Sequence, residues 1–202
     1  MDKLDLAKIN KSYYTAPTYP QLVAFELISY VTIARQGDPN GTVFAHATEA
    51  LYTLAYSVKG ICKKEGRDFT VAKLEGLWWV DGERTAMEVP SCEWNWKLMI
   101  RVPDYVTMEM VESARQIASL NKKEMVTLSQ VHYETLHEGK CVQMLHVGPY
   151  STEQETVKCI EIFMHENRLK PYGRHHEIYL SDPRKVEPLK MKTILRHPVQ
   201  TV

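Results

Sequence analysis

The length, composition and charge of the chain indicate an ordinary globular protein. Its 202 residues suit one domain, or two small halves packed as one. Hydrophobic residues make up 44% and charged residues 25%, which excludes a disordered or fibrous chain. The 25 basic residues balance the 25 acidic ones, whereas a dedicated nucleic-acid binder usually carries a basic excess. We therefore expect no nucleic-acid partner.

The sequence also lacks the usual signals for membranes and secretion. No apolar run approaches the roughly 20 residues that a membrane span needs. The polar N-terminal stretch lacks the apolar region of a secretory signal. The four cysteines are scattered and form no Cys-x-x-Cys pair. These features predict a cytoplasmic protein with reduced thiols and no membrane partner.

The hydrophobic periodicity predicts alternating strands and helices. Residues 1–21 contain two prolines and are expected to form an irregular lead-in. Strands are predicted over 23–35, 69–80, 93–102, 126–135, 141–147, 175–183 and 191–199. Helices are predicted over 42–65, 107–123 and about 152–168, with Thr42 as the N-cap of the first and Gly66 as its stop.

This order contains an internal repeat. In each half a strand leads to a glycine and a proline, then a helix, then two more strands; the glycines are Gly37 and Gly148. The predicted fold class is α+β, with duplicated β-α-β-β units that pack with pseudo-twofold symmetry and enclose a ligand groove. We expect one domain over 1–202, with halves at about 22–103 and 126–199 joined by a helix at about 107–123.

Alternation along the strands selects candidate groove residues. Ile178 and Leu180 are expected to face the helix, so Glu177 and Tyr179 should face the groove. The repeat places Glu75 at the corresponding point of the first half. A carboxylate between aromatic walls suits a general base, and it equally suits a partner for a flat cation. The residues alone leave both uses open.

Metal and cofactor chemistry has little support in the sequence. The eight histidines form no His-Glu-x-x-His motif. The adjacent pair His175 and His176 should point to opposite faces of a strand and cannot chelate together. We expect neither a metal nor a cofactor.

Three runs in the second half resemble a known family. They are Met144-Leu145-His146-Val147-Gly148-Pro149-Tyr150, His176-Glu177-Ile178-Tyr179-Leu180-Ser181-Asp182-Pro183 and Lys192-Thr193-Ile194-Leu195-Arg196. In order and spacing they resemble the GyrI-like small-molecule-binding domain, which is also the effector-binding half of multidrug-responsive transcription activators. The resemblance implies the duplicated fold and matches Glu177 to the family glutamate that meets cationic aromatic ligands.

The ending of the chain resembles the standalone branch of this family, which includes hydrolases of cyclopropanoid genotoxins of the yatakemycin type. The resemblance implies detoxification by water addition to a strained ring, with an acidic residue and aromatic groove residues taking part. We expect Glu177 and Tyr133 to be catalytic. The expected substrate-binding residues are Glu75, Trp79, Trp96, Tyr150, Tyr179 and His146.

Two other functions stay open beside the hydrolase. One is a non-catalytic binder of flat cationic drugs, which would use the same site without turnover. The other is a protein inhibitor of DNA gyrase, as the family name suggests. Only about 20 residues precede the first predicted strand, too few for a helix-turn-helix, so a transcription activator is not expected. The expected partner is a small hydrophobic or aromatic ligand, cationic in the binder hypothesis.

Overall fold

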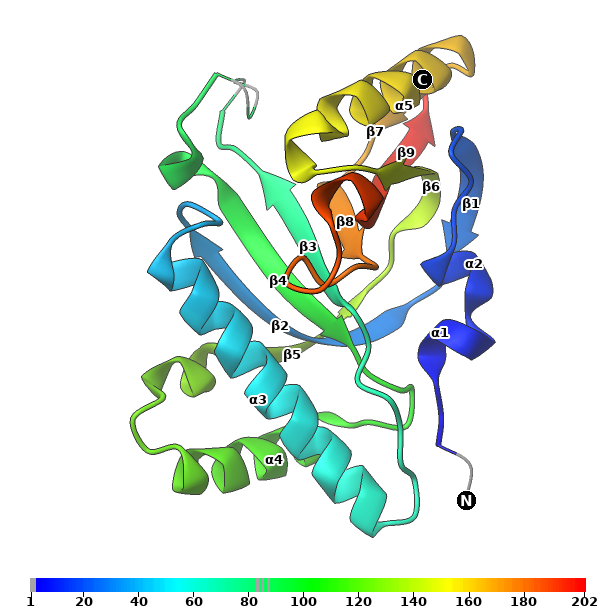
Figure 1. The fold of residues 1–202 in the computed structure, drawn as a ribbon. Coiled ribbons are helices and arrows are strands. Elements are labelled where there is room, and N and C mark those ends of the chain that lie inside the picture. The colour runs from blue at the N-terminus through cyan, green and yellow to red at the C-terminus, as the bar shows by residue number, and fades with distance from the viewer. Residues whose placement is uncertain (1–2, 83, 85, 87) are drawn as a thin grey trace. The chain divides into compact units, whose positions relative to one another are not determined.

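The computed structural model describes residues 3–82, 84, 86 and 88–202. The chain forms two compact units that are interleaved along the sequence (Figure 1). Unit 1 comprises the chain up to Ile9, Ile28–Ala72 and Trp78–Leu136, and unit 2 comprises Asn10–Leu27, Lys73–Leu77 and His137–Val202. The arrangement of the two repeat halves as one domain stays a prediction.

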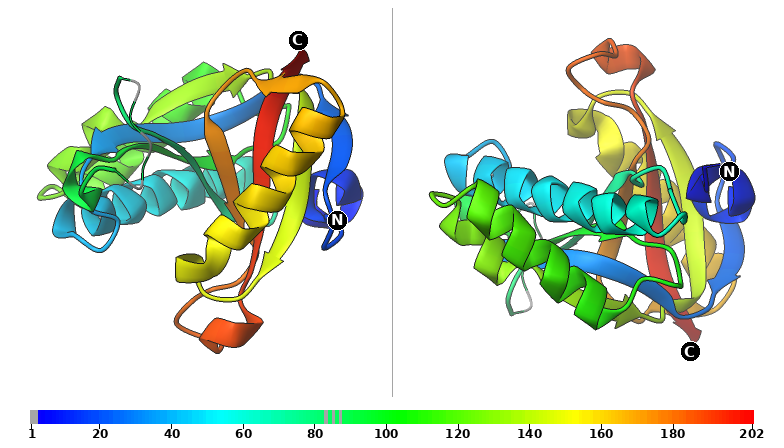
Figure 2. Two further views of the ribbon diagram at one scale, coloured as in Figure 1. Left: turned by 90° about the horizontal axis from the view of Figure 1, so that it is seen from above. Right: turned by 90° about the horizontal axis from the view of Figure 1, so that it is seen from below.

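Unit 1 packs two helices against antiparallel strands. Its elements are α1 (Leu6–Ile9), β2 (Ile28–Gln36), α3 (Thr42–Lys64), η1 (Ser91–Glu93), β4 (Asn95–Arg101), α4 (Met108–Asn121), η2 (Val126–Gln130) and β5 (His132–Leu136). β2 lies between β4 and β5. α3 packs on β2 and β4, and α4 lies beside α3 (Figure 2, right). The small buried side chains of Ala47, Ala50 and Ala55 let α3 approach its neighbours closely.

Unit 2 packs one long helix on a second antiparallel sheet. Its elements are α2 (Lys11–Tyr14), β1 (Gln21–Phe25), β6 (Gly139–Val147), η3 (Tyr150–Thr152), α5 (Glu153–Glu166), β7 (Leu169–Pro171), β8 (His175–Tyr179), η4 (Pro188–Lys190) and β9 (Lys192–Thr201). The strand order is β1-β6-β9-β8, β7 pairs with β9, and β8 is followed by β3 (Leu74–Trp79), whose residues up to Leu77 belong to this unit. α5 lies along β6 and β9 (Figure 2, left).

The repeat predicted from the sequence recurs in the backbone of each unit. Gly37 follows β2 with φ 142°, and Gly148 follows β6 with φ 146°. The amide of Gly37 donates to the carbonyl of Trp94, just before β4, and the amide of Gly148 donates to that of Met191, just before β9. In each unit the strand before the glycine pairs with the last strand of the repeat. The α+β class of the prediction is confirmed.

Several predicted boundaries are wrong. The lead-in contains two short helices, and the strand predicted over 23–35 is two strands separated by exposed Glu26 and Leu27. Residues 126–130 form a 3₁₀ helix rather than a strand, and the predicted loop after α5 contains β7. The N-cap of α3 is Gly41 instead of Thr42. Hydrophobic patterns locate the elements, but pairing partners far along the chain decide where each one ends.

Candidate functional site: a carboxyl pair at the start of α5

Glu177 lies on β8, on the sheet face that α5 covers. In the register of β8 with β9, Glu177 is opposite Leu195 and Tyr179 is opposite Thr193. Directly opposed residues of antiparallel strands point to the same face. Leu195 belongs to the core cluster that includes the buried residues of α5. The prediction that Ile178 faces the helix and Glu177 faces away from it is therefore wrong.

The reason for this error is that both faces of β8 are covered. Ile178 and its register partner Ile194 are each 0% exposed, on the face opposite α5. A buried apolar residue therefore does not identify the helix side of this strand. The Glu177 side chain keeps 13% of its surface exposed, so it is nearly but not fully withdrawn from solvent.

Glu153, the first residue of α5, forms a carboxyl pair with Glu177. The hydroxyl of Thr193 hydrogen-bonds one side of the Glu153 carboxyl group. The other oxygen, Oε1, is buried and has no hydrogen-bond partner among the described residues. Burial, followed by the negative charge of Glu177, raises the pKa of Glu153 to about 9. At neutral pH the Glu153 carboxyl group is therefore protonated.

Two tyrosines accompany this carboxyl pair. The rings of Tyr150 and Tyr179 meet edge to face with their centroids 5.9 Å apart. Burial raises the pKa of Tyr150 to about 12, and the charges of Glu153, Glu177 and Asp182 contribute further. Its phenol therefore stays neutral, and Tyr150, which is 43% exposed, offers ring surface to a ligand. Unit 2 thus brings together three of the predicted residues, Glu177, Tyr150 and Tyr179.

Two histidines continue the polar chain from Glu177. His175 Nε2 lies 3.1 Å from Glu177 Oε1, and His175 Nδ1 lies 2.8 Å from His197 Nε2. Burial, followed by His175, lowers the pKa of His197 to about 3, so this imidazole is neutral. These hydrogen-bonded side chains lie on the sheet face that α5 covers, since His175 and His197 occupy the same alternating set of positions as Glu177 and Leu195.

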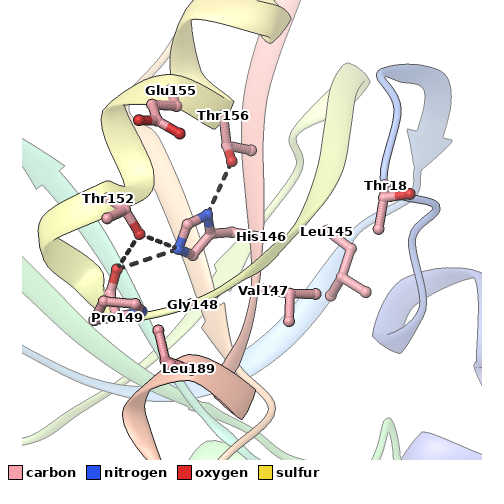
Figure 3. Close-up of a pocket in the computed structure, with 10 residues that line it drawn as sticks. All are labelled: Thr18, Leu145, His146, Val147, Gly148, Pro149, Thr152, Glu155, Thr156 and Leu189. Carbon is pink, nitrogen blue, oxygen red and sulfur yellow. Dashed lines mark hydrogen bonds between the residues drawn. The ribbon is translucent and has the colours of Figure 1, made fainter.

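A pocket of about 390 Å³ lies on the His146 side of α5 (Figure 3). It is lined by Thr18, Leu145, His146, Val147, Gly148, Pro149, Thr152, Glu155, Thr156 and Leu189. His146 Nδ1 lies 2.9 Å from the Thr156 hydroxyl, and His146 Nε2 lies 3.2 Å from the carbonyl of Pro149. Through these two contacts, His146 links β6 to α5 and to the turn that precedes α5. A contact between His146 and substrate stays a prediction.

Gly148 allows His146 to approach this turn closely. We expect Gly148→Ala to lower the free energy of unfolding by about 1–3 kcal/mol. Its φ of 146° is rarely adopted by other residues, and an added Cβ would lie 3.0 Å from Thr152 Oγ1 and 3.2 Å from His146 Nε2. Gly37 is a matched control, because its φ is 142° but no atom lies within 4 Å of the added Cβ.

Denaturant unfolding of both variants tests this expectation. Both should lose stability through backbone strain, and Gly148→Ala should lose more because it also displaces the imidazole. Equal losses in the two variants would show that the close approach at Gly148 contributes nothing.

Glu75, the repeat counterpart of Glu177, is fully buried. Its Oε2 accepts hydrogen bonds from the Tyr13 hydroxyl and from His176 Nε2, the latter at 3.0 Å. Its Oε1 is buried and has no partner among the described residues. The charged partner of Glu75 is His176, which stands 101 positions away along the chain. With 0% of its side chain exposed, Glu75 presents no surface to a ligand, and its predicted role in substrate binding stays untested.

The contacts of Glu75 belong to a larger buried polar network on the face opposite α5. Glu138 accepts from His176 Nδ1 at 2.9 Å and from Arg196 at 3.2 Å. Arg196 also donates to Gln143 and to the carbonyl of Tyr13. The network pairs two carboxylates with two cations, so it holds no net charge when all four are ionised.

The remaining predicted site residues lie in unit 1. Trp96 is 0% exposed and donates to the carbonyl of Gly37 at 3.0 Å, so it is a core residue. Trp79 is half-buried. The Tyr133 hydroxyl lies 3.0 Å from that of Ser29 and donates to the carbonyl of Val106 at 3.2 Å. The catalytic role of Tyr133 and the ligand contacts of both tryptophans stay predictions.

Three residues of the unit 2 site were missed in the sequence. Glu153 is the first residue of α5. The sequence does not show that its side chain lies near Glu177 on β8, because this depends on where α5 begins and how it packs. His175 and His197 carry a usable signal, because alternation places His175 on the same face as Glu177. The distance between His175 and His197 along the chain hides their pairing, which depends on the register of β8 with β9.

The chain belongs to the family of the GyrI-like small molecule binding domain, whose model matches residues 20–198. The family defines a domain that binds small molecules. The resemblance noted in the sequence is thereby confirmed, together with the expectation of a small-molecule partner in its general form.

Two solved structures are similar along the whole chain. An uncharacterized conserved protein from Listeria innocua is 38% identical, with TM-score 0.92, and covers 98% of this chain and 100% of its own. A hydrolase from Listeria innocua is 37% identical, with TM-score 0.86 and the same coverage. The EcmrR C-terminal domain, at 10% identity and TM-score 0.61 over 91% of this chain and 98% of its own, shares the fold.

No protein of curated function matches the chain significantly. Within the described part of the chain, no three His, Cys, Asp or Glu side chains gather in a way that could hold a metal ion. None of the helices in the described residues has both the length and the hydropathy of a membrane crossing.

Proposed function

We propose that the protein is a hydrolase that adds water to flat, hydrophobic compounds carrying a strained cyclopropane conjugated to a carbonyl group. The observation that supports this most is the carboxyl pair, in which Glu153 is protonated at neutral pH while Glu177 accepts a hydrogen bond from His175. A carboxyl group whose surroundings keep it protonated at neutral pH can serve as a general acid beside a carboxylate that acts as the base. The 37% identity to a Listeria hydrolase supports the same conclusion.

The proposed step uses each carboxyl group once. Glu177 takes a proton from water as the water oxygen bonds to a cyclopropane carbon. The ring C–C bond breaks, its electron pair moves into the conjugated carbonyl, and the carbonyl oxygen takes the proton of Glu153. The product has gained one water, and nothing is oxidised or reduced. The proton on Glu177 then returns to Glu153, which restores the protonated state of Glu153.

The tyrosines are proposed to hold the flat ligand. Tyr150 and Tyr179 meet edge to face, which leaves ring surface for stacking beside the carboxyl pair. The neutral phenol of Tyr150 adds no charge that would repel an aromatic compound. In this proposal Glu153 and Glu177 carry the chemistry and the two tyrosines carry the binding.

The test is product analysis after incubation with a cyclopropanoid compound. We expect mass spectrometry to show that the product has gained one water and that its new oxygen comes from oxygen-18-labelled water. The amount of product should exceed the amount of protein many times. Heat-denatured protein gives the spontaneous rate. If product never exceeds this rate, the hydrolase proposal is wrong.

A second candidate function uses the same residues without turnover. A carboxylate beside aromatic rings attracts flat cations, so a non-catalytic binder of cationic drugs fits Glu177, Tyr150 and Tyr179 as well. A dye such as a rhodamine, titrated by fluorescence anisotropy, separates the two. Saturable dye binding together with an unchanged cyclopropanoid compound would favour the binder.

A further inference from the structure

The histidine pair beside Glu177 forms a hydrogen-bonded series that ends on the carboxyl group. A carboxylate only accepts, so His175 Nε2 must donate to Glu177 Oε1 across 3.1 Å. On its other side, His175 Nδ1 lies 2.8 Å from His197 Nε2, so one of these two nitrogens donates to the other. His197 is buried and stays neutral. These contacts form a continuous hydrogen-bonded series from His197 through His175 to Glu177.

We propose that His175 is a positioning residue that holds Glu177 as an oriented carboxylate, and that His197 holds the imidazole of His175 in place through its other nitrogen. This proposal rests on the proposed function, in which Glu177 accepts a proton from water. His175 engages Oε1 of Glu177, and the proposal assigns Oε2 to the water. The side chain of His175 is 20% exposed and that of Glu177 is 13% exposed, so a ligand can reach the Glu177 end of this hydrogen-bonded series.

Loss of the donor should change the titration of Glu177 as well as the rate. A hydrogen bond donated to a carboxylate favours its ionised form. The titratable groups that face Glu177 are Glu153 on α5, Tyr150 on η3 and His175 on its own strand, with His197 behind His175 on β9. His175→Phe keeps an aromatic ring but removes the donor to Glu177 together with the contact to His197, so the ionisation of Glu177 should shift to higher pH.

The experiment compares three variants with the wild type. His175→Phe removes the donor, His175→Gln keeps an amide N–H, and His165→Phe is a control that changes an exposed histidine on α5, away from β8 in the chain. For His175→Phe we expect kcat to fall on the order of 10- to 100-fold, the range for a lost hydrogen bond to a charged group, and the acidic limb of kcat/KM to move to higher pH. His175→Gln should recover part of the rate, and His165→Phe should match the wild type.

A readout that needs no substrate separates this proposal from the proposed function. Carbon-13 NMR of labelled glutamate follows the ionisation of the Glu177 carboxyl group, which is assigned through the loss of its signal in Glu177→Gln. An upward shift in His175→Phe and a smaller shift in His175→Gln support the positioning role even if no cyclopropanoid is hydrolysed. An unchanged Glu177 titration in His175→Phe overturns it, and if that variant fails to fold, an unchanged titration in His175→Gln and His197→Phe together overturns it.

Discussion

Glu177→Gln is expected to lower turnover at least about a hundredfold, because a positioned general base contributes about 10²–10⁴-fold to rate. The amide keeps the shape of the side chain but cannot take a proton from water. Binding of a flat ligand should weaken much less, since the rings of Tyr150 and Tyr179 are untouched. Steady-state kinetics and ligand titration on the same variant measure the two effects.

Glu153→Gln should lower turnover by a similar factor and leave a different pH signature. In the wild type, kcat/KM should fall as pH rises toward about 9, where Glu153 loses the proton that it donates. The glutamine variant should lose this alkaline limb, because its side chain no longer titrates. It should retain the acidic limb, which the proposal assigns to Glu177.

Two control variants test whether these losses belong to the carboxyl pair. Glu155→Gln changes an exposed carboxylate on the same helix, on the side of the His146 pocket, and should leave turnover within about twofold of the wild type, as expected for a surface charge. Glu75→Gln changes the repeat counterpart, whose expected cost to turnover is under about tenfold. An inactive Glu75→Gln beside a nearly normal Glu177→Gln would place the active carboxylate in the other repeat.

The sequence predicted Glu177 but not its surroundings. Alternation correctly separated Glu177 and Tyr179 from Ile178, because side-chain direction along a strand is a local property. The side on which the helix lies is not local: it follows from the register of β8 with β9 and from the packing of Leu195 under α5. The same limit applies to Glu153, whose meeting with Glu177 depends on where α5 begins.

The two repeat glutamates, Glu75 and Glu177, also show that the surroundings of a residue cannot be predicted from its neighbours in sequence. Glu75 and Glu177 occupy matching points of the repeat, and the sequence offered only their neighbours as a difference. In the structure Glu75 is enclosed by Tyr13 and His176, and neither is near it in sequence. Burial of a charged residue depends on partners contributed by distant segments, and a single sequence does not name them.

The buried network around Glu138 should be the strongest polar contribution to the stability of unit 2. Glu138, with 4% of its side chain exposed, lies between His176 and Arg196, both with 0%. Removing one partner of a buried ion pair leaves an uncompensated charge and costs about 3–5 kcal/mol. We therefore expect Glu138→Gln to lower the free energy of unfolding by about that amount. Urea denaturation at neutral pH measures it.

The network should also give the stability a defined pH dependence. Although burial opposes it, the charges and hydrogen bonds of His176 and Arg196 lower the pKa of Glu138 from 4.5 to about 2. Its contribution is therefore present above about pH 4.5 and is lost as pH falls toward 2. Burial also opposes the charged form of His176, but the charges and hydrogen bonds of Glu138 and Glu75 raise the pKa of His176 from 6.5 to about 9. The contribution of His176 to stability is therefore complete below pH 6.5 and is lost as pH rises toward 9.

Glu138→Gln should change both sides of this profile. The loss of stability between about pH 4.5 and 2 should become shallower, because the main group responsible for it is gone. The alkaline loss should begin at lower pH, because the charge and hydrogen bond of Glu138 no longer raise the pKa of His176. The control is Glu187→Gln, which breaks an exposed pair with Lys190 and should change stability by less than about 1 kcal/mol. If the two variants unfold alike at every pH, the buried charges do not stabilise the fold, and the enclosure of Glu138 needs another physical cause.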